Sequence, residues 1–346
     1  MAQNVGTPRF YVSWGDYFKA LGYNIDPINL LNPSHKMYND TMTTGDYYEI
    51  FGDSPSGVYE DRSNMAANIN KGANFWFCLG HNLKGYKIIC KRYQNTDDDN
   101  FQEHEAEMGS TSTSVNYPVT EDGWSMRVGD DEGWSENFSP DFIEDIHTGF
   151  QTEDSQVITG SVTRGFSCMV YGRKYDMPHS PDLNLKLSYE YDGVKTTQTK
   201  GGATLSNATY TKPADWGNGG GAWQLGSDES GNPISNLRSG RRVWDLSFSY
   251  LSDTDIMPAV AATTNLEAGY AEGTPSDENT LLDGTDFFSQ VINKTMGGHL
   301  PFIFQADKSN NSPDQFAIAR FDMDSFSYEQ VANNVYDISL SVVESW

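Results

Sequence analysis

Apolar and polar residues alternate strictly in three stretches of the second half of the chain. Residues 183–191 place leucine or tyrosine at every odd position, and residues 244–250 and 336–342 repeat the pattern with Asp and Ser between the apolar positions. Such alternation is typical of a strand with one face on a core and the other in water. The phase changes between Phe321 and Tyr328, which predicts a bulge near Asp324.

The first half carries shorter apolar runs at residues 73–79 and 85–93, separated by a turn. In the first run Phe75 and Phe77 fall on one face and Trp76 and Cys78 on the other. A strand that is apolar on both faces is covered on both sides, as within a sandwich. Further strands are predicted at 157–162 and 166–171, and the polar, acidic stretch 94–116 is predicted to be an exposed loop.

Two helices interrupt this strand pattern. Residues 14–22 predict a two-turn helix that glycine ends. Residues 283–296 begin with capping residues, end at a glycine pair and place five apolar side chains at helical spacing. These five are Phe287, Phe288, Val291, Ile292 and Met296. The Gly, Ser and Asn-rich stretch 201–240 and the small, polar stretch 255–280 are predicted to be loops.

Together these patterns predict an all-β, mainly antiparallel protein. An N-terminal arm with a short helix is expected at 1–50, one β-sandwich module at 51–182, and a second at 183–346 with one packed α-helix near 283–296. The aromatic content of 13% and the 32 glycines fit many short strands joined by tight turns.

A formal net charge of −25 shapes the expected partners. Such a surface repels phosphate backbones and anionic lipids, so we expect neither nucleic acid nor a membrane as a partner. Two interpretations stay open, namely solubility in a salty or crowded setting and a partner surface that is basic or bridged by cations. The first residues lack a signal pattern and no apolar run reaches membrane length, so synthesis in a cytoplasm is expected.

Catalytic and metal-binding patterns are weak in this sequence. The six histidines form no zinc spacing, and the acidic clusters at 97–99 and 130–132 lack the spacing of a calcium loop. Cys78, Cys90 and Cys168 lie in apolar runs and are expected to be buried thiols. We therefore expect no enzyme, no cofactor and no metal, although a carboxylate pair of the glycosidase type needs no sequence motif.

One glycine-rich segment offers a candidate contact. Residues 217–222 match a dinucleotide pattern superficially, but no predicted strand precedes them. Trp216 and Trp223 flank the segment. Their rings either stack on a sugar or a partner, or pack against their own domain.

Two resemblances to known families follow from longer stretches. Residues 74–83, with the turn Gly80-His81-Asn82-Leu83, and residues 170–178 resemble the galactose-binding-type jelly roll of phage virion proteins. The resemblance covers about 50–182 and implies a jelly-roll, sugar-binding type of fold. Under it His81 either holds the turn by hydrogen bonds or meets a ligand.

The second half resembles virion and tail structural proteins of marine tailed phages. The stretches that carry this resemblance are 177–183, 200–205, 241–246, 300–304 and 335–346. Their order is similar to the sandwich-plus-helix plan of tail-tube and distal-tail proteins, from which the stretch 255–280 departs. The resemblance implies a homo-oligomeric ring, a hexamer or a trimer, that contacts other virion proteins.

The resemblance implies a virion structural protein, in the tail or baseplate, made in the host cytoplasm. A carbohydrate-binding adhesion module that meets a host surface glycan is the first alternative. A capsid decoration or head-fibre protein and a glycoside hydrolase are the others.

Overall fold

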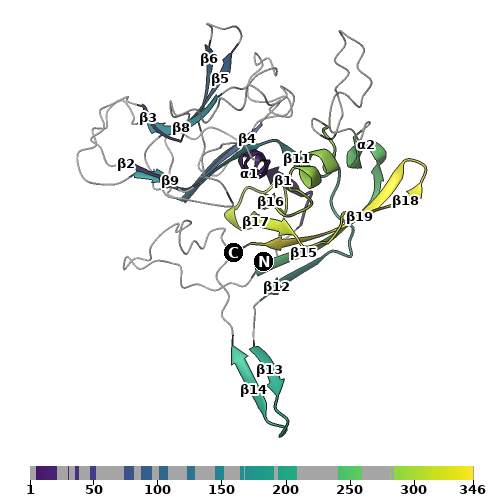
Figure 1. Cartoon of the computed structure of the whole chain (residues 1–346). Coiled ribbons are helices and arrows are strands. Elements are labelled where there is room, and N and C mark those ends of the chain that lie inside the picture. The colour runs from purple at the N-terminus through teal and green to yellow at the C-terminus, as the bar shows by residue number, and fades with distance from the viewer. Residues whose placement is uncertain are drawn as a thin grey trace.

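The structure is a computed structural model. It describes residues 5–21, 30, 36–38, 47–51, 74–81, 87–95, 101–107, 123–128, 145–151, 164–166, 168–190, 194–208, 241–258, 281 and 284–345. Within these residues the fold is all-β and mostly antiparallel, which confirms the predicted class (Figure 1).

An eight-stranded sheet forms the centre of the described part of the chain. Its strand order is β11-β1-β16-β17-β19-β15-β12, and β18 also pairs with β19. All of these pairs are antiparallel. The strands are β1 (Arg9–Val12), β11 (Lys174–Asp176), β12 (Lys186–Glu190), β15 (Arg241–Ser252), β16 (Phe302–Gln305), β17 (Phe316–Phe321), β18 (Tyr328–Ala332) and β19 (Val335–Glu344).

Four smaller sheets accompany the central one. They have the orders β10-β4-β7, β3-β8-β5-β6, β2-β9 and β13-β14. Their strands are β2 (Lys36–Tyr38), β3 (Tyr47–Phe51), β4 (Phe75–His81), β5 (Lys87–Asn95), β6 (Phe101–Glu107), β7 (Gly123–Val128), β8 (Asp145–Gln151), β9 (Arg164–Phe166), β10 (Cys168–Gly172), β13 (Val194–Gln198) and β14 (Thr204–Ala208).

Short helices connect the strands. The predicted N-terminal helix is α1 (Trp14–Ala20), and the Ser13 hydroxyl accepts a hydrogen bond from the Asp16 amide at 3.2 Å at its start. The others are α2 (Asp253–Ile256), a π-helix η3 (Phe288–Asn293) and a 3₁₀ turn η4 (Pro313–Gln315). The predicted helix at 283–296 is thus present, but its centre is a π-helix rather than an α-helix.

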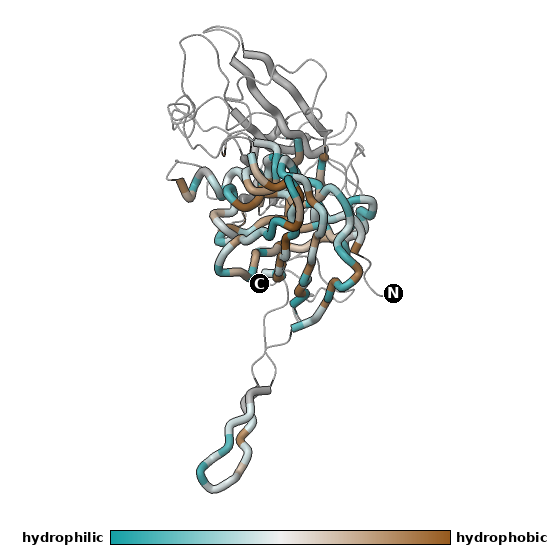
Figure 2. The backbone as a smooth tube through the Cα atoms, turned by 90° about the vertical axis from the view of Figure 1, so that its right-hand side faces the viewer, coloured by the Kyte–Doolittle hydropathy of each residue, from teal (hydrophilic) through white to brown (hydrophobic). Residues whose placement is uncertain are grey.

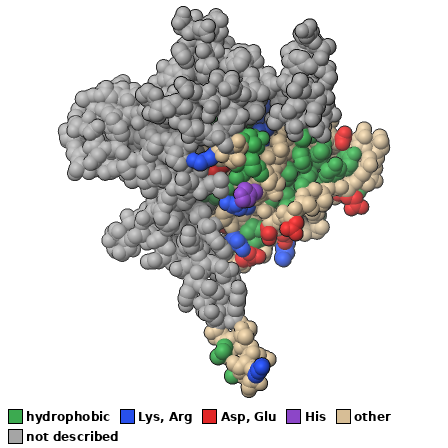
Figure 3. All heavy atoms as spheres, viewed as in Figure 1, with side chains coloured by type: hydrophobic (Ala, Val, Ile, Leu, Met, Phe, Trp, Pro, Cys, Tyr) green, Lys and Arg blue, Asp and Glu red, His purple; other side chains and the backbone are tan. Residues whose placement is uncertain are grey.

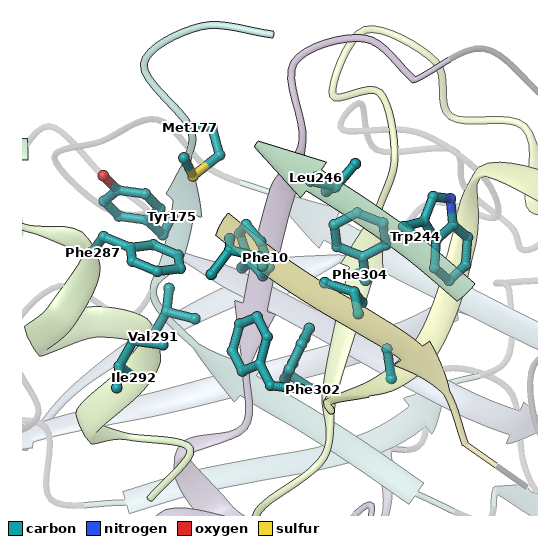
Figure 4. Packing of buried hydrophobic residues seen from close by; sticks show 14 of the residues in the cluster. Phe10, Tyr175, Met177, Trp244, Leu246, Phe287, Val291, Ile292, Phe302 and Phe304 are labelled. Atoms are coloured by element: carbon teal, nitrogen blue, oxygen red, sulfur yellow. The ribbon is translucent and has the colours of Figure 1, made fainter. Parts of the chain in front are cut away.

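One face of the central sheet carries a large buried core. Phe10 of β1 lies among Phe287, Phe302, Phe304 and Phe321, with ring centroids 5.3 to 5.8 Å away (Figure 4). Val291 and Ile292 of η3 belong to the same buried cluster. The predicted packing of the helix on the second half of the chain is therefore present. We call the central sheet and the helices packed on it the body. Among the coloured residues of Figure 2, the hydrophobic segments lie mainly in this body.

The opposite face is covered by β4 at the β1–β17 end of the sheet. Tyr11 of β1 meets Phe75 and Phe77 edge to face at 5.0 and 4.9 Å, and Phe316 of β17 meets Phe77 and Trp124. Every residue of β4 is buried. The expectation of a strand covered on both sides is confirmed, because the residues of both its faces are buried.

β1 and β11 lie far apart in sequence but beside each other in the central sheet. β1 belongs to the predicted arm 1–50 and β11 to the predicted module 51–182, and the strands of 183–346 complete the same sheet. The boundaries at 50 and 182 stay predictions. The central sheet therefore contains strands from the predicted arm, from the first predicted module and from the second.

Three local predictions were wrong. The stretch 94–116 contains β6, which pairs along its whole length with β5, because backbone pairing does not require apolar side chains. Residues 321–328 are no bulged strand: β17 ends at Phe321 and β18 starts at Tyr328, on the same side of β19. Register shifts lie instead between Phe248 and Leu251, where Tyr250 has a φ of +64°, and between Gln330 and Ala332 of β18.

The alternating stretch 183–191 also differs from its prediction, which placed every odd residue on the core, because Tyr189 of β12 is 53% exposed. Leu183 lies in a turn before β12 and is fully exposed, whereas Leu185 and Leu187 pack on the core. The predicted strand at 157–162 lies outside the described residues.

Candidate interaction surface

His81, a predicted contact residue, lies at the end of β4 and is buried. Gly80 before it has a φ of +65°, and the β4–β7 register shifts between Leu79 and His81. A glycine in this conformation is what a bulge of this kind requires. The predicted turn at Gly80-His81 is therefore the bulged end of a strand.

The His81 ring bonds across to β7. Its Nε2 lies 2.8 Å from the Ser125 hydroxyl, and burial lowers the pKa of His81 to about 4. A neutral imidazole beside a serine is the pair that nucleophilic catalysis uses, but Ser125 is fully buried as well. Since both groups lie inside the packed module, the geometry supports the first of the two predicted roles, holding the strand end by hydrogen bonds.

The other predicted contact residues give no structural test. Trp216, Trp223 and the acidic clusters at 97–99 and 130–132 lie outside the described residues, so their sugar, partner or calcium contacts stay predictions. Within the described ranges no group of three or more His, Cys, Asp or Glu side chains is placed to hold a metal ion. Nor does any helix there have the length and apolarity to cross a bilayer.

The hairpin β13–β14 is an exposed element of the described part of the chain. Its two strands pair with each other from Val194↔Ala208 to Gln198↔Thr204, and the hairpin stands apart from the body in Figures 1 and 2. The described side chains at 196–198 and 200–206 are exposed. Because neighbouring residues of a strand point to opposite faces, both faces of the hairpin are open.

Sequence reasoning placed residues 201–208 in a glycine-rich loop and missed this hairpin. A usable signal was present, because a Lys-Gly-Gly tip at 200–202 stands between the Thr-rich run 194–199 and the short run Ala-Thr-Leu-Ser at 203–206. Composition over the longer window 201–240 hid it. The short window alone predicts the turn.

The charge of the hairpin is opposite to that of the whole chain. Residues 194–208 contain Lys195 and Lys200 and no Asp or Glu, whereas the chain carries a net charge of −25. In Figure 3 the hairpin shows lysine and hydrophobic side chains and no acidic ones on the visible face. Leu205 is 59% exposed and supplies an apolar contact next to the tip.

Comparison with known proteins leaves the family open. No family model, no curated protein and no solved structure matches this chain. The resemblances to jelly-roll and tail proteins of phages therefore rest on the residues quoted for them and stay expectations.

Proposed function

We propose that this chain is a non-enzymatic structural protein of a tailed-phage virion, a tail or baseplate component that assembles as a symmetric homo-oligomer and contacts other virion proteins. The observation that carries the assembly part is the hairpin β13–β14, which is folded and exposed on both faces. The virion assignment rests on the resemblance of the second half to phage tail proteins.

The energetics of a hairpin support an assembly role. Two strands without a packed face are marginally stable in water, because they bury too little apolar area to offset the entropy of ordering them. A partner that covers one face supplies that area. Within the body, in contrast, both faces of the central sheet carry packed aromatic clusters.

Mass photometry of the full chain at submicromolar and micromolar concentrations tests the oligomer. We expect one closed species with a fixed number of subunits, because symmetric rings close at a defined count. Proteomics of purified virions tests the location. A chain that stays monomeric at every concentration and is missing from virions contradicts the proposal.

A further inference from the structure

We infer that the hairpin at 194–208 is a cationic docking arm that binds the acidic surface of a second copy of this chain. The inference deepens the proposed self-assembly and rests on it. It specifies which element makes the contact, states that the partner surface is acidic, and predicts that the contact depends on salt.

The tip of the arm is built to hold its shape. The Thr199 amide donates to the Ala203 carbonyl at 2.8 Å, and the Gly202 amide donates to the Thr199 carbonyl at 2.9 Å. The Ala203 amide also donates to the Thr199 hydroxyl at 3.1 Å. Gly202 has a φ of +81°, as the third residue of a three-residue hairpin loop requires. A preorganised tip loses little entropy when it binds.

Lys200 occupies the first position of that tip and is exposed. Within the described part of the chain its ammonium group has no carboxylate partner. Lys195 adds a second positive charge on β13. The arm therefore carries two positive charges and no negative one, and within the described part of the chain the charge of Lys200 is not neutralised.

Charge complementarity selects a second copy as the occupant. Two whole chains repel each other because each carries −25, so a contact needs a region of opposite sign on one of them. The arm is such a region, and the acidic remainder of a neighbouring chain is its complement.

The contact pairs different surfaces on the two copies, the arm of one with the body of the next. Such head-to-tail contacts propagate around an axis and close into a ring when the rotation permits. Leu205, beside the tip, adds apolar burial to the ionic attraction. A symmetric ring then carries one docked arm per interface.

Reversing the tip charge tests the arm. We compare Lys200→Glu with Lys186→Glu, which makes the same change in net charge at a lysine of β12 whose side chain is 71% exposed. Sedimentation velocity of the full chain in 50 and 500 mM NaCl gives the dissociation constant of the oligomer. In low salt we expect Lys200→Glu to raise this dissociation constant about tenfold and Lys186→Glu to change it less than threefold. High salt is expected to raise the dissociation constant of the wild-type oligomer.

A zero-length carbodiimide crosslink locates the contact. A mixture of ¹⁴N- and ¹⁵N-labelled chains is expected to yield a mixed-isotope peptide pair that joins Lys195 or Lys200 to an Asp or Glu. Two results overturn the docking arm: equal effects of Lys200→Glu and Lys186→Glu on the dissociation constant, or hairpin crosslinks that form only within single chains. If the oligomer still forms in these cases, the proposed function stands. A wild type that is monomeric throughout overturns both.

Discussion

Substituting Arg242 with Met removes a cation that is buried inside the central sheet. The Arg242 guanidinium donates to the Glu344 carboxylate through Nε at 3.0 Å and Nη2 at 2.7 Å, and it also donates to the carbonyls of Asp314 and Phe316. The Arg242 and Glu344 side chains are 10% and 2% exposed. The guanidinium also lies over the Trp244 ring, 5.0 Å from its centroid.

The size of the effect follows from what the substitution leaves behind. Glu344 becomes a buried carboxylate without its counter-charge, and two carbonyls lose this donor. Breaking one side of a buried, hydrogen-bonded pair costs about 3–5 kcal/mol of unfolding free energy. We therefore expect Arg242→Met to lower the free energy of unfolding by that amount, measured by urea denaturation followed by circular dichroism.

The neighbouring arginine is the matched control. Arg241 makes an ion pair of 2.7 Å with Glu190, but the two side chains are 26% and 51% exposed. Solvent screens such a pair, so Arg241→Met is expected to cost about 0.2–1 kcal/mol. Equal losses of unfolding free energy in the two variants contradict this expectation, because burial then makes no difference to what the ion pair contributes.

Three further variants test other parts of the structure by the same urea assay. Phe10→Ala is expected to cost about 3–5 kcal/mol, since its ring is fully buried; a loss under 1 kcal/mol contradicts the placement of β1 in the core. Gly172→Ala places a Cβ 2.4 Å from the Val12 carbonyl oxygen and is expected to cost about 1–3 kcal/mol, whereas Gly201→Ala meets no atom closer than 3.9 Å and serves as its control. Burial, which favours the neutral imidazole, lowers the pKa of His81 from 6.5 to about 4. The stability contributed by the neutral His81 is therefore complete above pH 6.5 and is lost as the pH falls toward 4. Between pH 7 and 4.5 the wild type is expected to lose about 2–3 kcal/mol more than His81→Gln, and parallel pH profiles contradict the buried neutral histidine.

Local patterns predicted the strands whose faces differ most in environment. In 336–342 every second residue is apolar, and Ile338, Leu340 and Val342 are buried as that period requires. Residues 14–22 and 283–296 predicted helical segments for a similar reason, since capping residues and apolar spacing are local properties. The π-helical geometry of the second was not predictable from spacing alone.

The register of the strands and the choice of neighbouring strands, in contrast, depend on contacts between residues that are distant in sequence. Arg242 and Glu344 are 102 residues apart, and His81 and Ser125 are 44 apart, so neither pair carries a local signal. His81 was picked out by its turn, but the burial that sets its chemistry depends on β7 and could not be inferred from it. The hairpin tip was locally encoded and was missed because a wide composition window hid it.

Side-chain period, turn residues and net charge are properties of the chain before it folds, and they already specify an all-β, acidic protein rich in alternating strands. Tertiary structure decided that strands from the start and middle of the chain complete the sheet of its end, and that a cationic hairpin stands clear of an acidic body. The physical reason is that a period fixes which face of a strand is apolar, whereas the free energy that selects its neighbour comes from burial shared with residues far along the chain.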